Sequence, residues 1–335
     1  MEDTAADASR DAPRAQRSAT TALLLATLLW GCGFTWAKTA GETANRMLGI
    51  GEGAAAGPVW VLAVRFLSAG VLWLLIFRDA RRGWDWPVAW RSVVLGSCLS
   101  GGMVLQHLGL DRTSEAVSAF LTSLTILFVP LLMTLVLRRP PPPAAWAGVI
   151  IASVGVWLMT GASAESFGAG EMLGLACAVA YSVDIVAVNL LVRPADVARV
   201  TAGQFFVVGA ICLIALLLLP GGRASVTPTR AMDLLGHSAI GANVALLAVL
   251  ASMGAFGLQF RFQPRIDPTR AALLYLVEPI FALAYAWIVT GRRLTAVGML
   301  GAAMILVANV LAEVLQSRKR SIVEEPAALG APVID

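Results

Sequence analysis

The chain has 335 residues, of which 58% are hydrophobic and only 14% are charged, and its mean hydropathy is +0.77. About a quarter of the residues of a soluble globular protein are charged, so this composition excludes an ordinary soluble domain and indicates a membrane protein. The net charge of +4 does not indicate nucleic-acid binding, because the arginines gather in loops between apolar segments.

The cysteines and histidines are few and scattered. Cys32, Cys98, Cys177 and Cys212 all lie inside apolar runs at unrelated spacings. We interpret them as small buried apolar residues rather than as a disulfide or a metal site. With two histidines and no Cys/His cluster, the sequence predicts no transition-metal site and no cofactor.

Ten apolar segments follow a polar start. Residues 1–18 are aperiodic and rich in Ala, Asp and Arg, which predicts a disordered cytoplasmic tail. The run from Thr20 to Lys38 is too long for a signal-peptide core, so we expect a spanning helix there. Residues 317–335, charged and then rich in Ala and Pro, form a second tail. Gly, Pro and Arg separate the predicted spans, which are about 19–39, 58–77, 92–110, 114–137, 144–161, 169–191, 201–220, 238–260, 269–290 and 296–316.

Positive charge outside the spans indicates the orientation. If the N-terminus faces inward, seventeen Lys and Arg residues lie on the inner side and seven on the outer side, with Arg65 inside a span. Cytoplasmic loops carry the excess of positive charge, so we expect both termini in the cytoplasm. The sequence thus predicts a multi-pass protein of the cytoplasmic membrane, of the bacterial inner-membrane type, in contact with the lipid bilayer. It leaves open a monomer or a homodimer.

Two stretches of the sequence repeat each other at an offset of 153 residues. LQHLGLDRTSEAVSAFLTSLT (105–125) aligns without a gap with LQFRFQPRIDPTRAALLYLVE (258–278). Earlier stretches match more loosely, namely WGCGFTWAK (30–38) with YSVDIVAVN (181–189) and RFLSAG (65–70) with QFFVVG (204–209). The ungapped alignment pairs Gln106 with Gln259, Ser118 with Ala271, Thr122 with Tyr275, and Thr125 with Glu278.

We infer that residues 19–161 and 169–316 are two copies of five helices each. An odd number of spans in each copy forces the second copy to insert upside down relative to the first. The predicted fold is therefore an all-α integral membrane protein, with ten transmembrane helices as two inverted five-helix repeats. Such repeats are characteristic of secondary transporters, whose site lies at the repeat interface near the membrane midplane.

Five stretches carry a resemblance to a known family: WGCGF with a following Lys, RF in the second span, GLDRTSEAVSAFLTSLTILFVPLL, PTRAALLYLVEPIFALAYAW and GMLGAAMILVANVL. Over roughly residues 19–316 the chain resembles the EamA type of the drug/metabolite transporter superfamily. This resemblance implies a ten-helix fold that carries small metabolites, often amino acids or amines, across the cytoplasmic membrane. The chain departs from the family at Arg138–Arg139 and Arg292–Arg293, where a Glu is common, and at Ile126, where Pro is frequent.

The segment from Thr269 to Thr290 carries a carboxylate, Glu278, near its middle, and Pro279 follows directly. A single helix at ~1.5 Å rise per residue would be roughly 33 Å long and would place Glu278 near the membrane centre. An ionised side chain there costs ~2.5–3.5 kcal/mol on insertion scales, so we expect Glu278 to act on substrate or protons. The alternative is a structural role as the partner of an arginine.

A continuous ninth helix would give Glu278 and Tyr275 a common face, and the paired fourth span would present a matching polar stripe. The two stripes predict the walls of one cavity. The alternative is that the hydroxyl groups join neighbouring helices by hydrogen bonds. The stripes comprise Ala271, Tyr275, Glu278, Ala282 and Tyr285 in the ninth span, and Ser114, Ser118, Thr122 and Thr125 in the fourth.

Two more ionisable residues lie inside predicted spans. Asp184 lies about two-thirds of the way through the sixth span, next to Tyr181, and is expected to face protein or water. Arg65 lies about two turns into the second span. It is suited to neutralise Glu278 or Asp184, or to bind a substrate carboxylate with its planar fork, and we favour the structural role slightly.

Two amides and three other side chains complete the candidates. Gln106 and Gln259 lie near the outer and inner mouths, where an amide offers donors and acceptors to polar solutes or to neighbouring helices. Trp30 either lines the cavity or packs. We interpret His107 as an interfacial residue and Lys38 as a side chain that reaches the outer interface.

The repeat, the odd span number and the buried carboxylates together predict a secondary transporter. It would be an exporter or exchanger of small polar metabolites that works by alternating access, with proton coupling through Glu278 or Asp184 as a hypothesis. A membrane-embedded enzyme would need a catalytic cluster, and an ATP-driven pump a Gly-rich loop followed by Lys, and the sequence has neither. An uncoupled facilitative channel is a further alternative, although the sequence shows no rings of like charge.

Overall fold

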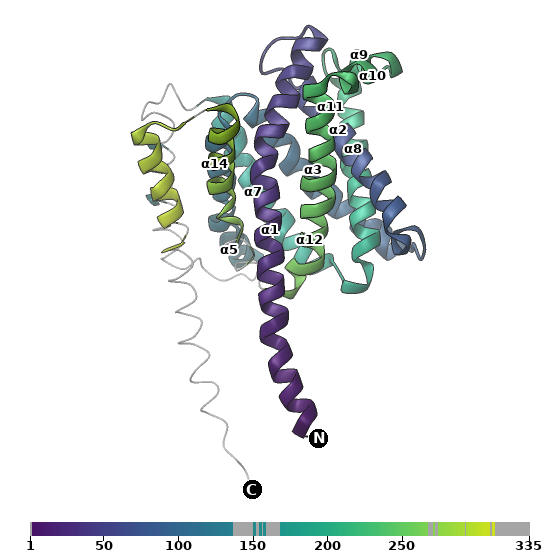
Figure 1. Cartoon of the computed structure of the whole chain (residues 1–335), viewed down its shortest axis with the longest axis vertical. Coiled ribbons are helices and arrows are strands. Elements are labelled where there is room, and N and C mark those ends of the chain that lie inside the picture. The colour runs from purple at the N-terminus through teal and green to yellow at the C-terminus, as the bar shows by residue number, and fades with distance from the viewer. Residues whose placement is uncertain are drawn as a thin grey trace.

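The computed structural model of the chain describes residues 2–136, 150–151, 154–155, 157–158, 168–266, 271, 274–291, 293–308 and 310–311. This described part is built of helices and contains no strand. The helices lie side by side, and α1 runs through the length of the bundle (Figure 1). They are α1 (Glu2–Leu48), α2 (Ala56–Ile76), α3 (Trp86–Leu110), α4 (Glu115–Ser123), α5 (Thr125–Val136), α7 (Ala169–Leu191), α8 (Val197–Leu218), α9 (Gly222–Ser225), α10 (Pro228–Gly236), α11 (Ser238–Leu246), a π-helix (Leu247–Gly254), α12 (Ala255–Phe262) and α14 (Glu278–Thr290).

Seven helices in the described part are long and apolar enough to cross a membrane. Two shorter apolar helices, α14 and Ala296–Ala308, lie where the ninth and tenth spans were predicted. Most of the predicted fifth span, 144–161, falls outside the described residues. The part of the chain that the structure describes is therefore all-helical, with seven helices of spanning length, and the count of ten stays a prediction.

Helix α1 is longer than predicted at both ends. It starts at Glu2, so the polar residues for which we expected no regular structure continue the helix. Their alanines and arginines are strong helix formers, although they show no apolar periodicity. At the other end α1 continues past the expected loop start to Leu48. Asn45 secures that end, because its Oδ1 accepts a hydrogen bond from Gly57 N at 2.8 Å and joins α1 to the start of α2.

Short polar residues start two of the helices. Asp85 Oδ1 accepts a hydrogen bond from Val88 N at 2.8 Å at the start of α3, and Ser114 Oγ accepts one from Val117 N at 3.2 Å at the start of α4. Each side chain satisfies a backbone donor that lacks a partner in the first helical turn. These residues occupy the polar breaks that separate the apolar segments in the sequence.

The two halves of the chain interlock. α3 packs on α7 and α8, α2 packs on α8, and α1 packs on α14, α11 and α12. The main core joins Phe66 of the first half to Phe205 and Phe256 of the second, with ring centroids 5.8 and 5.9 Å from Phe66. The space between the halves is therefore the interior of the protein.

The outer surface of the bundle is apolar. Leu75, Leu218 and Ile288 expose 63%, 79% and 77% of their area. Large apolar side chains that are exposed to this extent suit contact with lipid.

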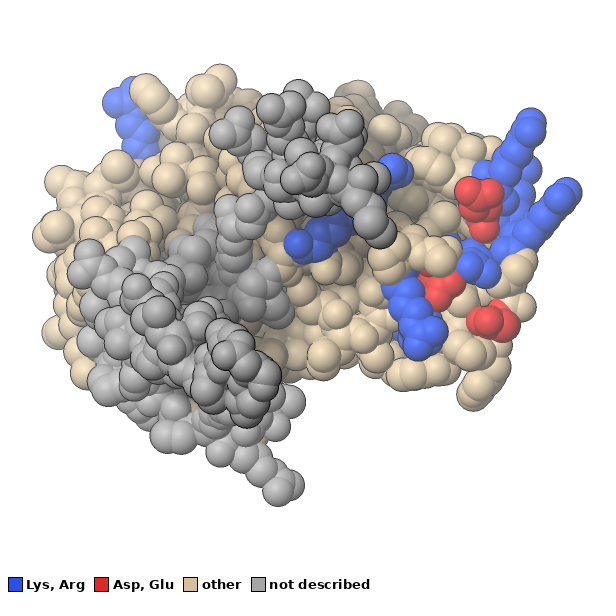
Figure 2. All heavy atoms as spheres, turned by 90° about the horizontal axis from the view of Figure 1, so that it is seen from below, with Lys and Arg blue, Asp and Glu red and all other residues tan. Residues whose placement is uncertain are grey.

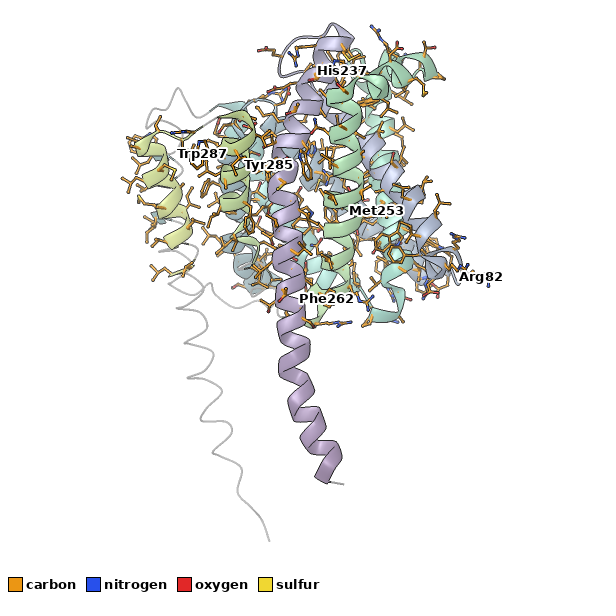
Figure 3. The ribbon with its side chains drawn as sticks, in the orientation of Figure 1. Arg82, His237, Met253, Phe262, Tyr285 and Trp287 are labelled. Carbon is orange, nitrogen blue, oxygen red and sulfur yellow. The ribbon has the colours of Figure 1, made fainter. Side chains whose placement is uncertain are left out.

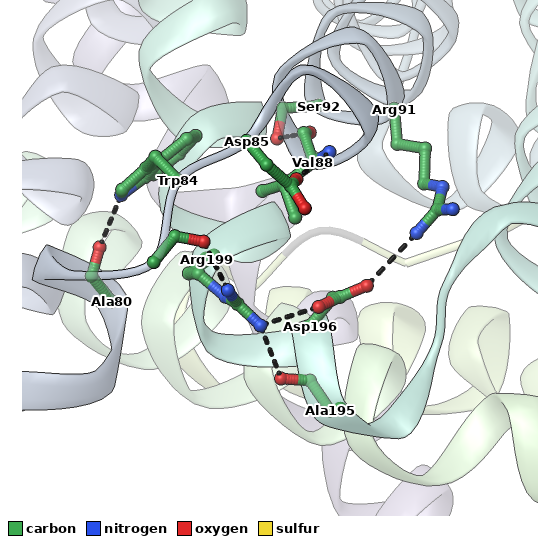
Figure 4. Close-up of polar contacts among 10 residues, drawn as sticks. Ala80, Trp84, Asp85, Val88, Arg91, Ser92, Ala195, Asp196 and Arg199 are labelled. Carbon is green, nitrogen blue, oxygen red and sulfur yellow. Dashed lines mark hydrogen bonds and ion pairs between the residues drawn. The ribbon is translucent and has the colours of Figure 1, made fainter.

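Charged side chains on the face nearest the N-terminus gather toward one edge (Figure 2). Asp196 accepts from Arg91 Nη1 at 3.0 Å and from Arg199 Nη2 at 2.6 Å, while Arg199 also donates to the Gly83 carbonyl (Figure 4). This cluster joins the start of α3 to the start of α8.

Candidate functional site

Two helices are broken at positions that the repeat alignment pairs. α4 ends at Ser123 and α5 begins at Thr125, while α14 begins at Glu278 after a turn. The fourth predicted span remains one apolar helical run, Glu115–Leu135, with a one-residue turn at Leu124. The expectation of one continuous ninth helix over 269–290 is wrong, because a turn at residues 276–277 precedes α14. Pro279 favours the first turn of a helix because its missing N–H has no partner there in any case. At the other break, Thr125 Oγ1 donates to Thr122 O at 2.6 Å and caps the end of α4.

A cavity of about 810 Å³, counted with the space at its mouth, lies beside these breaks. Its wall comes from helices of both halves of the chain. All nine candidate residues predicted from the sequence line it, namely Trp30, Arg65, Gln106, Thr125, Tyr181, Asp184, Gln259, Tyr275 and Glu278. The structure thus brings the nine residues together around one cavity, while their roles in transport stay predictions.

Trp30 packs against neighbouring aromatic rings and also lines the cavity, so both interpretations of this residue hold. Its indole Nε1 donates to Ala251 O at 3.1 Å. Its ring lies against Phe256 and Tyr275, with centroids 5.1 and 5.4 Å away. Trp30 is thus a fixed aromatic wall that ties α1 to the second half of the chain.

The π-helix supplies partners at the middle of the bundle. Figure 3 shows Met253, which belongs to it, between His237 at one end of the protein and Phe262 toward the other. π-helical turns are rare overall but frequent at functional sites. Ser252 Oγ accepts a hydrogen bond from Arg65 Nε at 2.7 Å. This contact holds Arg65, which is 97% buried, and its guanidinium lines the cavity.

A polar cluster borders the cavity on the side of the first half. Gln106 Nε2 donates to Thr122 Oγ1 at 3.3 Å, and Gln106 Oε1 accepts from Tyr181 OH at 3.0 Å. Thr125 Oγ1 also lies 3.3 Å from Ala178 O, so the start of α5 is fastened to α7. Gln106 therefore joins helices as well as lining the cavity.

The symmetry-related cluster in the second half is more extensive. Gln259 Nε2 and Tyr275 OH both donate to Gln263 Oε1 at 2.8 Å. Gln263 Nε2 donates in turn to Asn189 Oδ1 at 2.6 Å and to Ile185 O at 3.1 Å. Gln259 and Tyr275 repeat the pairing of Gln106 and Thr122, but a third residue, Gln263, now bridges them.

Two carboxylates, Asp184 and Glu278, line the cavity and form no ion pair with another described residue. Asp184 is buried, and its Oδ1 has no hydrogen-bond partner within the described part of the chain. Among the same residues no ion pair reaches Asp184 or Glu278. Arg65 bonds Ser252 rather than either carboxylate, and its part in neutralising one of them stays a prediction. Glu278 lies in the first turn of α14, where the helix dipole favours a negative charge by about 0.3–1 kcal/mol.

Two residues differ from their predicted positions. His107 is buried and lines the cavity, with Nδ1 3.0 Å from Met103 O, so it is not an interfacial residue. Lys38 is buried rather than extended toward solvent, and its Nζ donates to Leu110 O at 2.8 Å and to Thr113 O at 2.6 Å at the corner between α3 and α4. The repeat carried a signal for Lys38, since the loose alignment pairs it with Asn189. Nothing in the sequence singled out Gln263 or Ser252.

Comparison with known proteins identifies one family twice in the chain. The EamA-like transporter family matches residues 17–161 and again residues 168–313. The two matches divide the chain at the point where the internal repeat divides it.

Individual relatives are distant but cover most of the chain. An uncharacterised transporter of Archaeoglobus fulgidus is 25% identical over 289 residues, which are 86% of this chain and 83% of the relative. An uncharacterised transporter of Synechocystis sp. is 24% identical over 279 residues, 76% of this chain and 81% of the relative. A chloroplastic WAT1-related protein of Arabidopsis thaliana is 24% identical over 275 residues, 76% of this chain and 62% of the relative. A solved crystal structure, 22% identical, covers 90% of this chain and 99% of its own with a TM-score of 0.60, and shows a shared fold.

Proposed function

Because the chain belongs to the EamA-like transporter family, we propose that it is a secondary transporter that moves small polar metabolites across the cytoplasmic membrane. Its substrates would be amino acids or amines, carried outward or exchanged by alternating access. The proposed frame is ten helices in two inverted repeats, residues 19–161 and 169–316, with both termini in the cytoplasm. The charge distribution supports this orientation.

One observation carries the proposal: a cavity lined by both halves of the chain, beside two helix breaks at positions that the repeat pairs. Discontinuous helices at corresponding places in inverted repeats are typical of substrate sites in secondary transporters. Residues on both sides of the breaks, Ser123 with Thr125 and Tyr275 with Glu278, line this cavity. The cavity also contains both a guanidinium and carboxylates, which suits solutes with charged groups of either sign.

The first experiment is uptake by the purified protein in liposomes. Amino acids, amines and organic cations are offered in turn, with and without a pH gradient. We expect saturable uptake of at least one compound class, with accumulation that follows the gradient if protons are coupled. Uptake at the same rate with and without the pH gradient would indicate facilitated diffusion. If no compound of the panel enters these liposomes faster than it enters protein-free liposomes, the proposal is contradicted.

The proton hypothesis is tested with Glu278→Gln and Asp184→Asn. Each amide keeps the size of the side chain but cannot release a proton, so the coupling residue should lose uphill uptake while exchange of labelled for unlabelled substrate persists. Asp233→Asn is the control, because Asp233 is an exposed residue of α10, away from the cavity. If both cavity variants keep the uphill uptake and the pH dependence of the parent, neither carboxylate couples protons.

A further inference from the structure

Lys38 joins α1 to the corner between α3 and α4. Its side chain is 91% buried, and its Nζ donates to two backbone carbonyls of that corner, Leu110 O at 2.8 Å and Thr113 O at 2.6 Å. Glu42, one turn further along α1, lies 3.3 Å from the same Nζ. We call this set of contacts the Lys38 latch.

Asn189 makes the corresponding contact in the second half. Its Nδ2 donates to Ile266 O at 3.1 Å, at the corner that follows α12. Its Oδ1 accepts from Gln263 Nε2 at 2.6 Å. This set of contacts is the Asn189 latch.

The two latches are equivalent under the internal repeat. The loose alignment pairs Lys38 with Asn189, and the offset of 153 pairs Thr113 with Ile266 and Leu110 with Gln263. In both halves, the first helix therefore binds the same corner of its own repeat through the same residue position. The equivalence holds although the side chains differ in length and charge, which indicates a contact that belongs to the architecture of each repeat.

The latches lie at opposite ends of the cavity. Ile266 packs with Leu23 near the start of the apolar part of α1. Lys38 follows Leu23 by fifteen residues, so the two latches lie about 22 Å apart along α1. Each latch borders the cavity, because Leu110 lines it beside one latch and Ile185, a partner of Gln263, lines it beside the other.

We propose that Lys38 and Asn189 are the gate residues of the transport cycle, each closing one end of the cavity, and that alternating access releases one latch while the other holds. This proposal rests on the proposed function. Hydrogen bonds from a charged donor are stronger than those from a neutral amide, so the Lys38 latch is the tighter of the two. The cavity should consequently open more readily at the Asn189 end, the end expected to face the cytoplasm.

The test measures the two ends separately, without any substrate. Pairs of spin labels are attached in a cysteine-free background, at Arg46→Cys with Arg112→Cys for the Lys38 end, and at Leu190→Cys with Arg265→Cys for the Asn189 end. All four positions are exposed. Pulsed EPR in lipid then gives the distance distribution across each end. A protein that failed every uptake assay would still give these distances, so failure of the latches and failure of the proposed function are distinguishable.

We expect opposite effects of two variants. Lys38→Met should raise the long-distance population at the Lys38 end roughly tenfold or more, since a charged hydrogen-bond donor is lost, and leave the Asn189 end unchanged. Asn189→Leu should open only the Asn189 end, by a smaller factor. Asn243→Leu is the matched control, because the side-chain amide of Asn243 donates to Ala239 O of its own helix.

Glu42→Gln separates the carbonyl contacts of Lys38 from its ion pair. It should leave the Lys38 end closed, since Leu110 O and Thr113 O keep their donor. The proposal is overturned if Lys38→Met and Asn189→Leu leave both distributions at the parent values, if either variant opens both ends together, or if Glu42→Gln opens the Lys38 end as much as Lys38→Met does. Should Lys38→Met fail to fold, Lys38→Gln and Asn189→Leu provide the same two-ended comparison.

Discussion

Gly31 offers a sharp test of how α14 is positioned. A Cβ at Gly31 would lie 2.7 Å from Phe281 Cβ and 3.0 Å from both Ala282 N and Glu278 O. Real Cβ atoms essentially never approach another atom as closely as 2.7 Å, and the two contacts at 3.0 Å, also tighter than most, are with backbone atoms of the first turns of α14. Gly31→Ala should therefore push α14, and Glu278 with it, away from α1.

The size of the effect follows from two opposing terms. Overpacking of a closely packed interior costs about 1–3 kcal/mol. Replacing a glycine inside a helix by alanine recovers up to ~1 kcal/mol of helix propensity. Gly101→Ala in α3 is the control, because a Cβ there meets nothing within 4 Å and only the propensity gain applies. Gly31→Ala should thus be about 1–3 kcal/mol less stable than Gly101→Ala.

The assay compares apparent melting temperatures of the two variants in one detergent, followed by uptake in liposomes. We expect Gly31→Ala to melt several degrees below Gly101→Ala and to transport more slowly, because the turn that carries Glu278 has moved. Equal melting temperatures and equal uptake for the two variants would refute the argument that the contact of α14 with α1 at Gly31 positions Glu278.

Three further predictions follow from single contacts. Arg65→Lys keeps the charge but loses the planar fork and the Nε bond to Ser252, so we expect a higher KM for carboxylate substrates in the uptake assay. Asp196→Asn weakens two charged hydrogen bonds and should lower the stability by about 1–3 kcal/mol, measured as a lower melting temperature, with a smaller difference at high salt. Burial raises the pKa of Asp111, so the folded state holds the carboxyl proton more tightly than the unfolded state does. The melting temperature of the parent should therefore fall relative to that of Asp111→Asn as the pH rises from about 4. An equal pH dependence of the two melting temperatures would contradict this.

The sequence alone predicted the class of fold and nine of the residues that line the cavity. Composition and the length of the apolar runs depend only on local chemistry, so they identified the membrane-spanning helices. The repeat pairs Thr125 with Glu278, and α5 and α14 begin at these two residues. Polar residues inside apolar spans avoid lipid, which is why nine residues chosen by this reasoning lie around one cavity.

The tertiary structure decided where the helices break and what each polar side chain contacts. The apolar pattern is the same for a continuous helix and for one interrupted at residue 124 or 277, because hydrophobicity does not record where the backbone hydrogen bonds stop. Lys38 was placed at the interface by its position in the sequence, yet the corner that contains Leu110 and Thr113 folds within reach of its amine and supplies two carbonyls. Contacts of this kind join residues more than seventy positions apart, so only the packing of the helices could reveal them.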